Sequence, residues 1–218
     1  MRTITTTSTL YKFEELSESA QKTALDKLRD WNVDAIDWWD YLYDNFKKKM
    51  PLGYYVGRIN FSGFWSQGDG AKFNGIVTKN HNQCLALLPC DLAAQVRAFN
   101  AKCRLLGIEE IVLEFHSKID SSGHYEHSGC MSLDCPTFTH DWDDTLGDIL
   151  MQSEFHELAQ ALYDCNEIDE AVIKEARGYA DDLYRDLEKE YEYLTSDEAV
   201  SENIIHSELE FTEDGDLA

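Results

Sequence analysis

One uninterrupted apolar stripe constrains the fold of this chain more than any other feature of its sequence. Between residues 168 and 194, apolar residues recur at steps of three and four, a spacing that puts them on one face of an α-helix. At 1.5 Å per residue this helix is about 40 Å long, so we expect it to dock on the rest of the protein. The stripe comprises Ile168, Val172, Ala176, Tyr179, Leu183, Leu187, Tyr191 and Leu194.

Acidic residues of the same segment fall largely off this stripe. An amphipathic helix turns such residues towards water, so the docked helix would present a ladder of negative charge to solvent. The residues that we expect to form the ladder, and to contact a partner, are Asp181, Asp182, Asp186, Glu188 and Glu192.

The negative charge of the chain is unevenly placed. Asp and Glu outnumber Lys and Arg by 25 to 4 in residues 141–218, against 17 to 15 in residues 1–140, so the last third carries nearly all of the formal net charge of −23. A field of this sign repels nucleic acids and anionic membranes and attracts basic protein surfaces. We therefore expect a protein partner with a basic surface, and no direct binding to nucleic acid or membrane.

The sequence also bears on location. No window approaches the roughly 18 consecutive apolar residues of a membrane span, and the first residues lack the apolar core of a secretion signal. Six cysteines are scattered without a C-x-x-C pair, which is typical of reduced, buried thiols rather than of a disulfide framework. We expect the protein to lie in the cytoplasm.

The remaining elements are predicted from periodicity and from turn residues. Helical spacing predicts helices over residues 18–32, 33–50 and 89–106, whereas aromatic and β-branched residues predict a hairpin over 55–61 and 73–77. We expect a second hairpin over 110–119 and 124–133, a last strand within 204–211 and a frayed acidic tail over 212–218.

These elements predict an α+β fold. We expect a mixed, largely antiparallel sheet of hairpins packed with helices, plus the long acidic helix near the carboxyl end. Residues 1–140 would form the α+β core, and residues 141–218 an acidic helical region with a terminal strand. The two regions would pack together as one domain.

A glycine-rich segment, Ser66-Gln67-Gly68-Asp69-Gly70, separates the two strands of the first hairpin. It lacks the Lys-Ser/Thr ending of a phosphate-binding loop, and one carboxylate is too few for a calcium loop. We interpret the segment first as a shaped turn and second as a contact for a partner. The contact residues would be Trp65, Gln67 and Asp69.

Histidine and cysteine residues crowd around the second hairpin. His116, His124, His127 and Cys130 are weak candidates for metal ligands, and Cys135 lies close by in the sequence. Because side chains alternate across a strand, His124 and Cys130 would face one side and His127 the other, which argues against a metal site. Cys130 with His116 is a loose candidate for a catalytic pair. We expect no cofactor and no enzymatic activity.

Three stretches resemble a family of uncharacterised proteins encoded by tailed bacteriophages and some bacteria. They are YKFEELSESAQKTALDKLRDWNVD, FSGFWSQGDGAKF and SELEFTEDG, of which the second is the specific motif. The resemblance does not extend over residues 80–140. Some relatives are labelled as the antitoxin of a toxin–antitoxin stability system. The resemblance implies a phage or prophage setting and no catalytic residues.

Three hypotheses follow. The first is a phage-encoded acidic protein that binds and inhibits a host defence protein, such as a nuclease or a CRISPR or restriction component, by presenting carboxylates where a nucleic acid would present phosphates. The second is an antitoxin that neutralises a toxin by direct binding. The third is a small metal-dependent or Cys/His-dependent enzyme.

Overall fold

The computed structural model describes residues 2, 9–34, 37–141 and 152–218, with the backbone alone at residues 135 and 138–141. The chain divides into two compact units. Unit 1 combines residues 1–44 with residues 185–218, and unit 2 is the continuous stretch 45–184. Helices α3 (Asp40–Lys49) and α7 (Glu167–Leu194) each run across the boundary between the units.

Unit 2 is built on a four-stranded antiparallel sheet. Its strands are β2 (Tyr54–Ser62), β3 (Gly70–Lys79), β4 (Val112–Asp120) and β5 (Ser132–Asp141), in the spatial order β2-β3-β4-β5. Every neighbouring pair is antiparallel. Together with the helices, this sheet confirms the predicted α+β class, and the strands expected over 55–61, 73–77 and 110–119 are confirmed.

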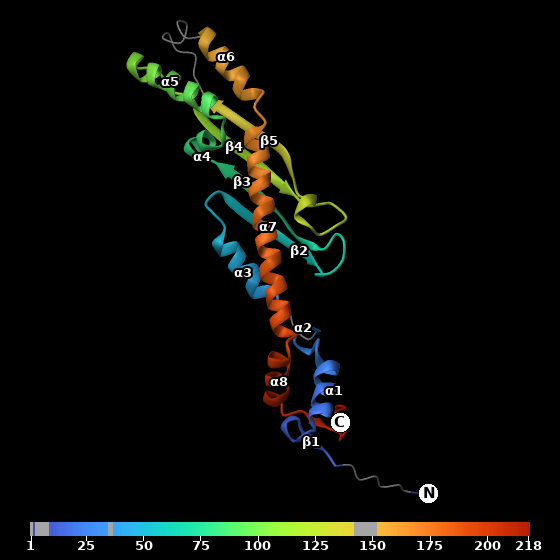
Figure 1. The fold of residues 1–218 in the computed structure, drawn as a ribbon. Coiled ribbons are helices and arrows are strands. Elements are labelled where there is room, and N and C mark those ends of the chain that lie inside the picture. The colour runs from blue at the N-terminus through green and yellow to red at the C-terminus, as the bar shows by residue number, and fades with distance from the viewer. Residues whose placement is uncertain (1, 3–8, 35–36, 142–151) are drawn as a thin grey trace. The chain divides into compact units, whose positions relative to one another are not determined.

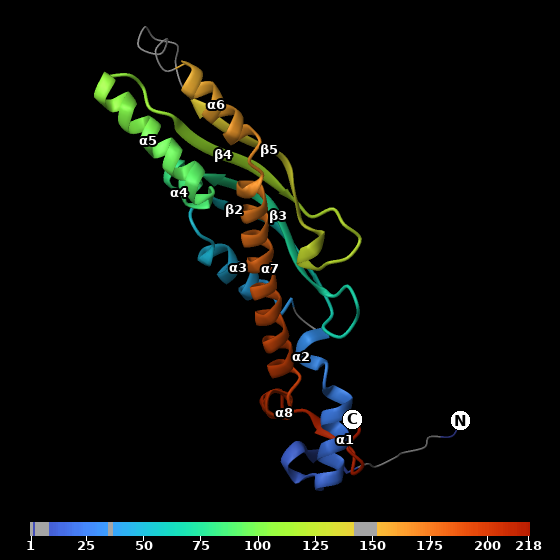
Figure 2. The ribbon, with the colours of Figure 1, turned by 45° about the horizontal axis from the view of Figure 1, so that its top comes forward.

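Side chains alternate along β4 as they should in a sheet with one covered face. Leu113, Phe115 and Ile119 are buried, whereas Glu114 and His116 are exposed. Helix α7 lies across the covered face in both views of the fold (Figures 1 and 2). Within unit 2 the predicted stripe is therefore the docking face of this helix, since residues 168, 172, 176 and 183 are all at most 3% exposed and Tyr179 is half-buried.

A polar cluster fixes α7 to the sheet within unit 2. Lys79 Nζ and Tyr54 Oη both donate hydrogen bonds to the carboxylate of Glu175, over 2.7 and 2.8 Å. The Lys79 ammonium also lies 4.6 Å from the centre of the Tyr54 ring. Burial, reinforced by the hydrogen bond with Glu175, raises the pKa of Tyr54 above its ordinary value, so this hydroxyl stays a donor.

The other helices of unit 2 are α4 (His81–Leu87), α5 (Cys90–Leu106) and α6 (Gln152–Tyr163). Helix α5 confirms the prediction over 89–106. It ends at Gly107, whose left-handed backbone (φ +72°) is the usual glycine stop of a helix. Helices α5 and α6 pack against each other through Phe99 and Phe155.

Unit 1 is formed by both ends of the chain. Strand β1 (Tyr11–Lys12) pairs with β6 (Glu210–Phe211), and α1 (Glu18–Leu28) packs against α8 (Asp197–His206). A 3₁₀ turn, η1 (Phe13–Glu15), and a short helix, α2 (Trp31–Asp34), complete the described elements of this unit. Its core consists of Phe13, Leu16, Ala20, Ala24, Val200, Ile204 and Phe211.

Several expectations are corrected by the structure. The helix predicted over 33–50 is interrupted: α2 ends at Asp34, α3 begins at Asp40, and residues 35–36 lie outside the described residues. The strand expected within 204–211 is limited to β6, because residues 204–206 complete α8. The tail expected to fray is ordered, since Thr212 N–H donates to Asp216 O over 2.8 Å and Lys27 pairs with the Asp216 carboxylate.

The division expected at residue 140 also differs from the observed one. Because β1 pairs with β6 and α1 packs with α8, the amino-terminal residues share a unit with the carboxyl-terminal ones rather than with the sheet. Among the described residues, no helix combines the length and hydrophobicity that a membrane crossing requires.

Candidate functional site

The loop between β2 and β3 is shaped by one carboxylate. Asp69 accepts hydrogen bonds from Ser62 Oγ (3.1 Å), Trp65 N–H (3.1 Å) and Ser66 N–H (2.7 Å), and its own N–H donates to Ser66 O. These bonds hold a turn in which Gly68 adopts φ +96°, a backbone angle that favours glycine. The prediction that this segment is a shaped turn agrees with this geometry.

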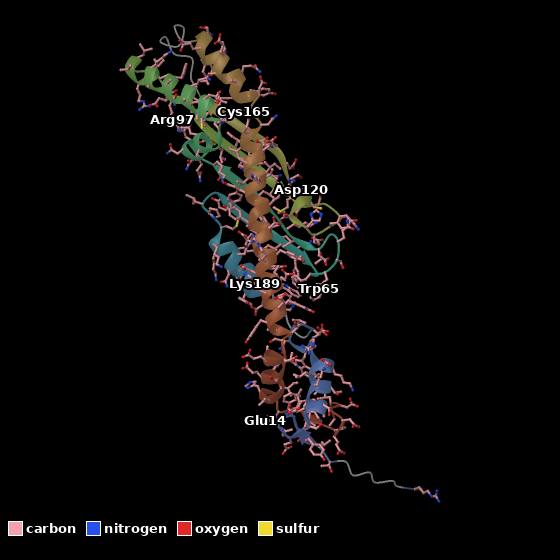
Figure 3. The ribbon with its side chains drawn as sticks, in the orientation of Figure 1. Glu14, Trp65, Arg97, Asp120, Cys165 and Lys189 are labelled. Atoms are coloured by element: carbon pink, nitrogen blue, oxygen red, sulfur yellow. The ribbon has the colours of Figure 1, made fainter. Side chains whose placement is uncertain are left out.

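The same turn presents a large aromatic side chain to solvent. Trp65 is 75% exposed and extends from the loop (Figure 3), and Gln67 is exposed two residues further on. On the inner side, Phe64 packs against Tyr184 of α7, whose hydroxyl donates to Gly63 O over 2.9 Å. Exposed tryptophan on an ordered loop is a frequent anchor in protein interfaces.

A second loop lies against the first. The connection between β4 and β5, residues 121–131, folds over β3 so that a side chain at Gly68 would collide with the Tyr125 ring. A side chain at Gly70 would come within 2.5 Å of His127 Cα. We call these two segments, residues 63–69 and 121–131, the paired loops; they lie side by side in both ribbon views (Figures 1 and 2).

A buried lysine holds the second loop in place. The side chain of Lys72 is 3% exposed, and its ammonium donates to Gly123 O over 2.6 Å and to Tyr125 O over 2.9 Å. A Glu126 oxygen lies 3.3 Å from the same nitrogen, although it has no hydrogen bond among the described residues. Sequence reasoning missed Lys72; a lysine within the apolar run Ala71–Val77 is the signal that could have found it.

The histidine and cysteine candidates are only partly brought together. Residues 124–130 were expected to be the start of a strand, but β5 begins at Ser132, and a 3₁₀ turn, η2 (Ser128–Cys130), precedes it. The alternation that we used to separate His124 and Cys130 from His127 therefore does not apply. In the structure, Cys130 Sγ lies 3.9 Å from His127 Nε2, and the His127 ring stacks on Tyr125 at 6.0 Å.

His116 is separate from this group. It pairs with Thr78, which lies eight residues along β3 from Gly70, where His127 packs. At about 3.3 Å per residue this separation is about 26 Å, so the pairing of Cys130 with His116 is wrong. Across the described part of the chain, His, Cys, Asp and Glu form no group of three or more with the geometry to hold a metal ion.

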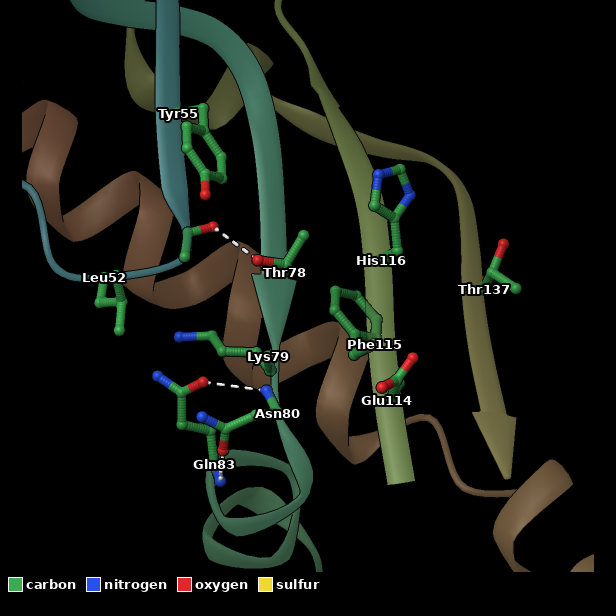
Figure 4. A pocket seen from close by; sticks show the side chains of 11 residues that line it. Leu52, Tyr55, Thr78, Lys79, Asn80, Gln83, Glu114, Phe115, His116 and Thr137 are labelled. Atoms are coloured by element: carbon green, nitrogen blue, oxygen red, sulfur yellow. Dashed lines mark hydrogen bonds between the residues drawn. The ribbon is translucent and has the colours of Figure 1, made fainter. Parts of the chain in front are cut away.

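His116 instead lines a cleft on the open face of the sheet. The cleft has a volume of about 360 Å³. Tyr55, Thr78, His116 and Thr137 come from the four neighbouring strands, and Asn80 and Gln83 close one end at the start of α4 (Figure 4). The lining offers hydroxyl, amide, imidazole, ammonium and carboxylate groups, so the cleft can bind a polar ligand.

The acidic candidates lie along the solvent side of α7. Asp181, Asp182, Asp186 and Glu192 are exposed and Glu188 is half-buried, as expected for residues off the docking stripe. Two exposed cations of the same helix, Arg185 and Lys189, are interleaved with them, so the face is predominantly rather than purely acidic. The paired loops and this helix face are treated as two separate candidate sites.

The surroundings of this face are strongly negative. Unit 1 contains 21 acidic and 7 basic residues, and all of its acidic residues except Glu188 and Glu190 are exposed. Burial, together with a hydrogen bond with Glu190 and the nearby charge of Asp186, raises the pKa of Tyr41 to about 12. Burial, with a smaller contribution from the negative charge of Glu114, raises the pKa of the Cys84 thiol to about 11 and keeps it protonated.

Comparison with known proteins identifies the family. Residues 38–197 match the family described as Domain of unknown function (DUF8835), and the chain belongs to this family. The match contains all of unit 2 but leaves out α1, α2 and nearly all of α8. Neither a curated protein nor a solved structure shows significant similarity to the chain.

Proposed function

We propose that this DUF8835 protein binds a basic surface of another protein through its acidic helix face, and acts by that binding rather than by catalysis. The observation that carries the proposal is the exposure of the carboxylates of unit 1 and of α7, where 19 of the 21 acidic residues of unit 1 face solvent. The carboxylates of such an excess repel one another and destabilise the folded unit. We therefore expect the exposed charge to serve recognition of a partner rather than stability.

The geometry of α7 suits a nucleic-acid-binding partner. Residues four apart on a helix are about 6 Å apart along its axis, so Asp182 and Asp186, or Glu188 and Glu192, form a sparser row than the phosphates of B-DNA, which carries one charge per about 1.7 Å. A basic groove that binds nucleic acid would accept this row. The resemblance to phage-encoded proteins supports a host defence protein as the target, inside the host cell.

The experiment is affinity capture from bacterial lysate with a matched pair of variants. The test variant neutralises the proposed contact, with Asp→Asn and Glu→Gln at Asp181, Asp182, Asp186, Glu188 and Glu192. The control removes five charges of unit 1 that lie outside α7, at Glu14, Glu18, Glu208, Glu213 and Asp214, which are all exposed. Capture is measured by quantitative mass spectrometry at 50 and 500 mM salt.

A charge-driven partner is retained by the wild type and the control at low salt, is lost with the test variant, and is released by high salt or by added duplex DNA. Partners that the test variant captures as well as the wild type does, at both salt concentrations, contradict the proposal.

A second candidate function is direct neutralisation of a toxin by the paired loops. The specific observation in its favour is that Trp65 is exposed on a turn already fixed by Asp69, because a preorganised anchor loses little conformational entropy on binding. Trp65→Ala should weaken this binding by tenfold or more, with little salt dependence. Loss of capture with the neutralised helix and not with Trp65→Ala would exclude this second candidate.

A further inference from the structure

A groove within unit 1 is not used by the acidic helix face. It has a volume of about 490 Å³ and lies between α2, the last turn of α7 and α8. Leu194 and Ala199 form its apolar lining, and Trp31, Tyr193, Glu202 and Asn203 surround it. Four lining residues come from α8: Ala199, Glu202, Asn203 and His206. They are three, one and three residues apart, so they share one face of the helix.

The groove is held open by a chain of amides. Asn32 Nδ2 donates to Leu194 O over 2.9 Å, and Asn203 Nδ2 donates to Asn32 Oδ1 over 2.5 Å. The Asn32 and Asn203 side chains are therefore held by hydrogen bonds within unit 1. The groups left to face an occupant are the rings of Trp31 and Tyr193, which are 39% and 53% exposed, the exposed carboxylate of Glu202 and the exposed imidazole of His206.

The electrostatics of the groove favour a cation. It lies at the carboxyl end of α7, where the helix dipole places partial negative charge. The structure already holds one guanidinium at this end: Arg29 donates to Thr195 O over 2.9 Å. Hydrogen bonds with Asp26 and Asp197 raise the pKa of Arg29 further. The amino end of α8, which carries partial positive charge, is nearby. The carboxylates of Asp197 and Glu198 in its first turn offset that charge.

We propose that this groove binds an arginine side chain of the basic partner. The alkyl stem would pack on Leu194 and Ala199, and the guanidinium plane would stack on an exposed ring with its charge towards Glu202. Arginine fits better than lysine because its planar, weakly hydrated group stacks on aromatic rings. This inference rests on the proposed function, since it names the anchor residue of the basic partner.

The experiment is an NMR titration of the full ¹⁵N-labelled chain with three tripeptides, Ac-Gly-Xaa-Gly-NH₂, in which Xaa is arginine, citrulline or norleucine. Citrulline keeps the shape of arginine without its charge, and norleucine offers only an apolar stem. The indole N–H signal of Trp31, identified with Trp31→Phe, reports on the groove, and that of Trp65 reports on the paired loops.

The arginine peptide should shift the Trp31 signal and leave the Trp65 signal unmoved. The citrulline and norleucine peptides should bind about tenfold more weakly or worse. Glu202→Gln should weaken arginine binding by up to about fivefold, and Trp31→Ala by about fivefold. Because Glu202 is exposed, its substitution leaves the fold intact and serves where Trp31→Ala destabilises unit 1.

Three results would overturn the inference: no Trp31 shift with arginine peptide at 20 mM, equal binding of the citrulline peptide, or tighter binding of the norleucine peptide. A negative titration combined with charge-dependent capture from lysate removes the arginine anchor and leaves the proposed function standing. A positive titration combined with charge-independent capture removes the proposed function of the acidic helix face and leaves arginine binding by the groove. The failure of one claim can therefore be distinguished from the failure of the other.

Discussion

Replacement of Lys72 by methionine tests whether the paired loops are held by one buried ammonium. Methionine keeps the packing of the lysine stem but removes both charge-assisted hydrogen bonds, to Gly123 O and Tyr125 O. Each such bond contributes about 1.5 to 3 kcal/mol. The Glu126 carboxylate would also lose the cation 3.3 Å away. Breaking a buried charge pair costs about 3 to 5 kcal/mol, and we expect Lys72→Met to lower the free energy of unfolding of unit 2 by that amount.

Urea denaturation measures this loss, and hydrogen exchange locates it in residues 121–131. Lys118→Met is the matched control, because Lys118 is an exposed lysine on the neighbouring strand; it should change stability by less than about 0.5 kcal/mol. Adding Glu126→Gln to Lys72→Met should recover about 1 to 2 kcal/mol, since the uncompensated charge is removed. If Lys72→Met is as stable as the Lys118 control and its loop exchanges no faster, the reasoning is refuted.

Three further predictions concern single side chains. Asp69→Ala removes three hydrogen bonds and should cost about 1 to 3 kcal/mol, with faster hydrogen exchange over residues 63–69 and a smaller effect for Asp69→Asn. Asn32→Ala should cost about 1 to 2 kcal/mol in thermal unfolding, because it leaves Leu194 O without its donor; an unchanged melting temperature would contradict this. His81 Nδ1 accepts a bond from Leu113 N–H, and burial lowers its pKa below the usual 6.5, so the folded state binds fewer protons than the unfolded state. Wild-type stability should therefore fall relative to His81→Gln as the pH drops below about 6.5, and parallel pH profiles would exclude this account.

Periodic segments were predictable because burial alone decides them. The stripe from Ile168 to Leu194 identified α7 and its docking face, and the strand predicted over 110–119 corresponds to β4. In both, each residue's environment follows from its position in the repeat. The solvent face of α7 was predictable for the same reason, as the complement of the stripe.

Contacts between distant residues decided the rest. Residues 124–130 have the composition of a strand, but Lys72, about fifty residues earlier, binds two carbonyl groups of the connection that contains them, and the strand starts later. The carboxyl-terminal tail looked too acidic to order, yet a side chain at Gly215 would collide with the backbone of Ala20. Neither contact leaves a local pattern, so the neighbourhood of Cys130 and His127 could not be predicted either.

The pairing of Tyr11 with Phe211 has a consequence for biosynthesis. At ribosomal speeds of about 5 to 20 residues per second, the nascent chain carries α1 for roughly ten seconds or more before α8 leaves the exit tunnel. During that interval the apolar face of α1, with Ala20 and Ala24, has no partner from the carboxyl end. The residues of unit 2 are all synthesised within that interval, so the core of unit 1 can be completed only after they have left the ribosome.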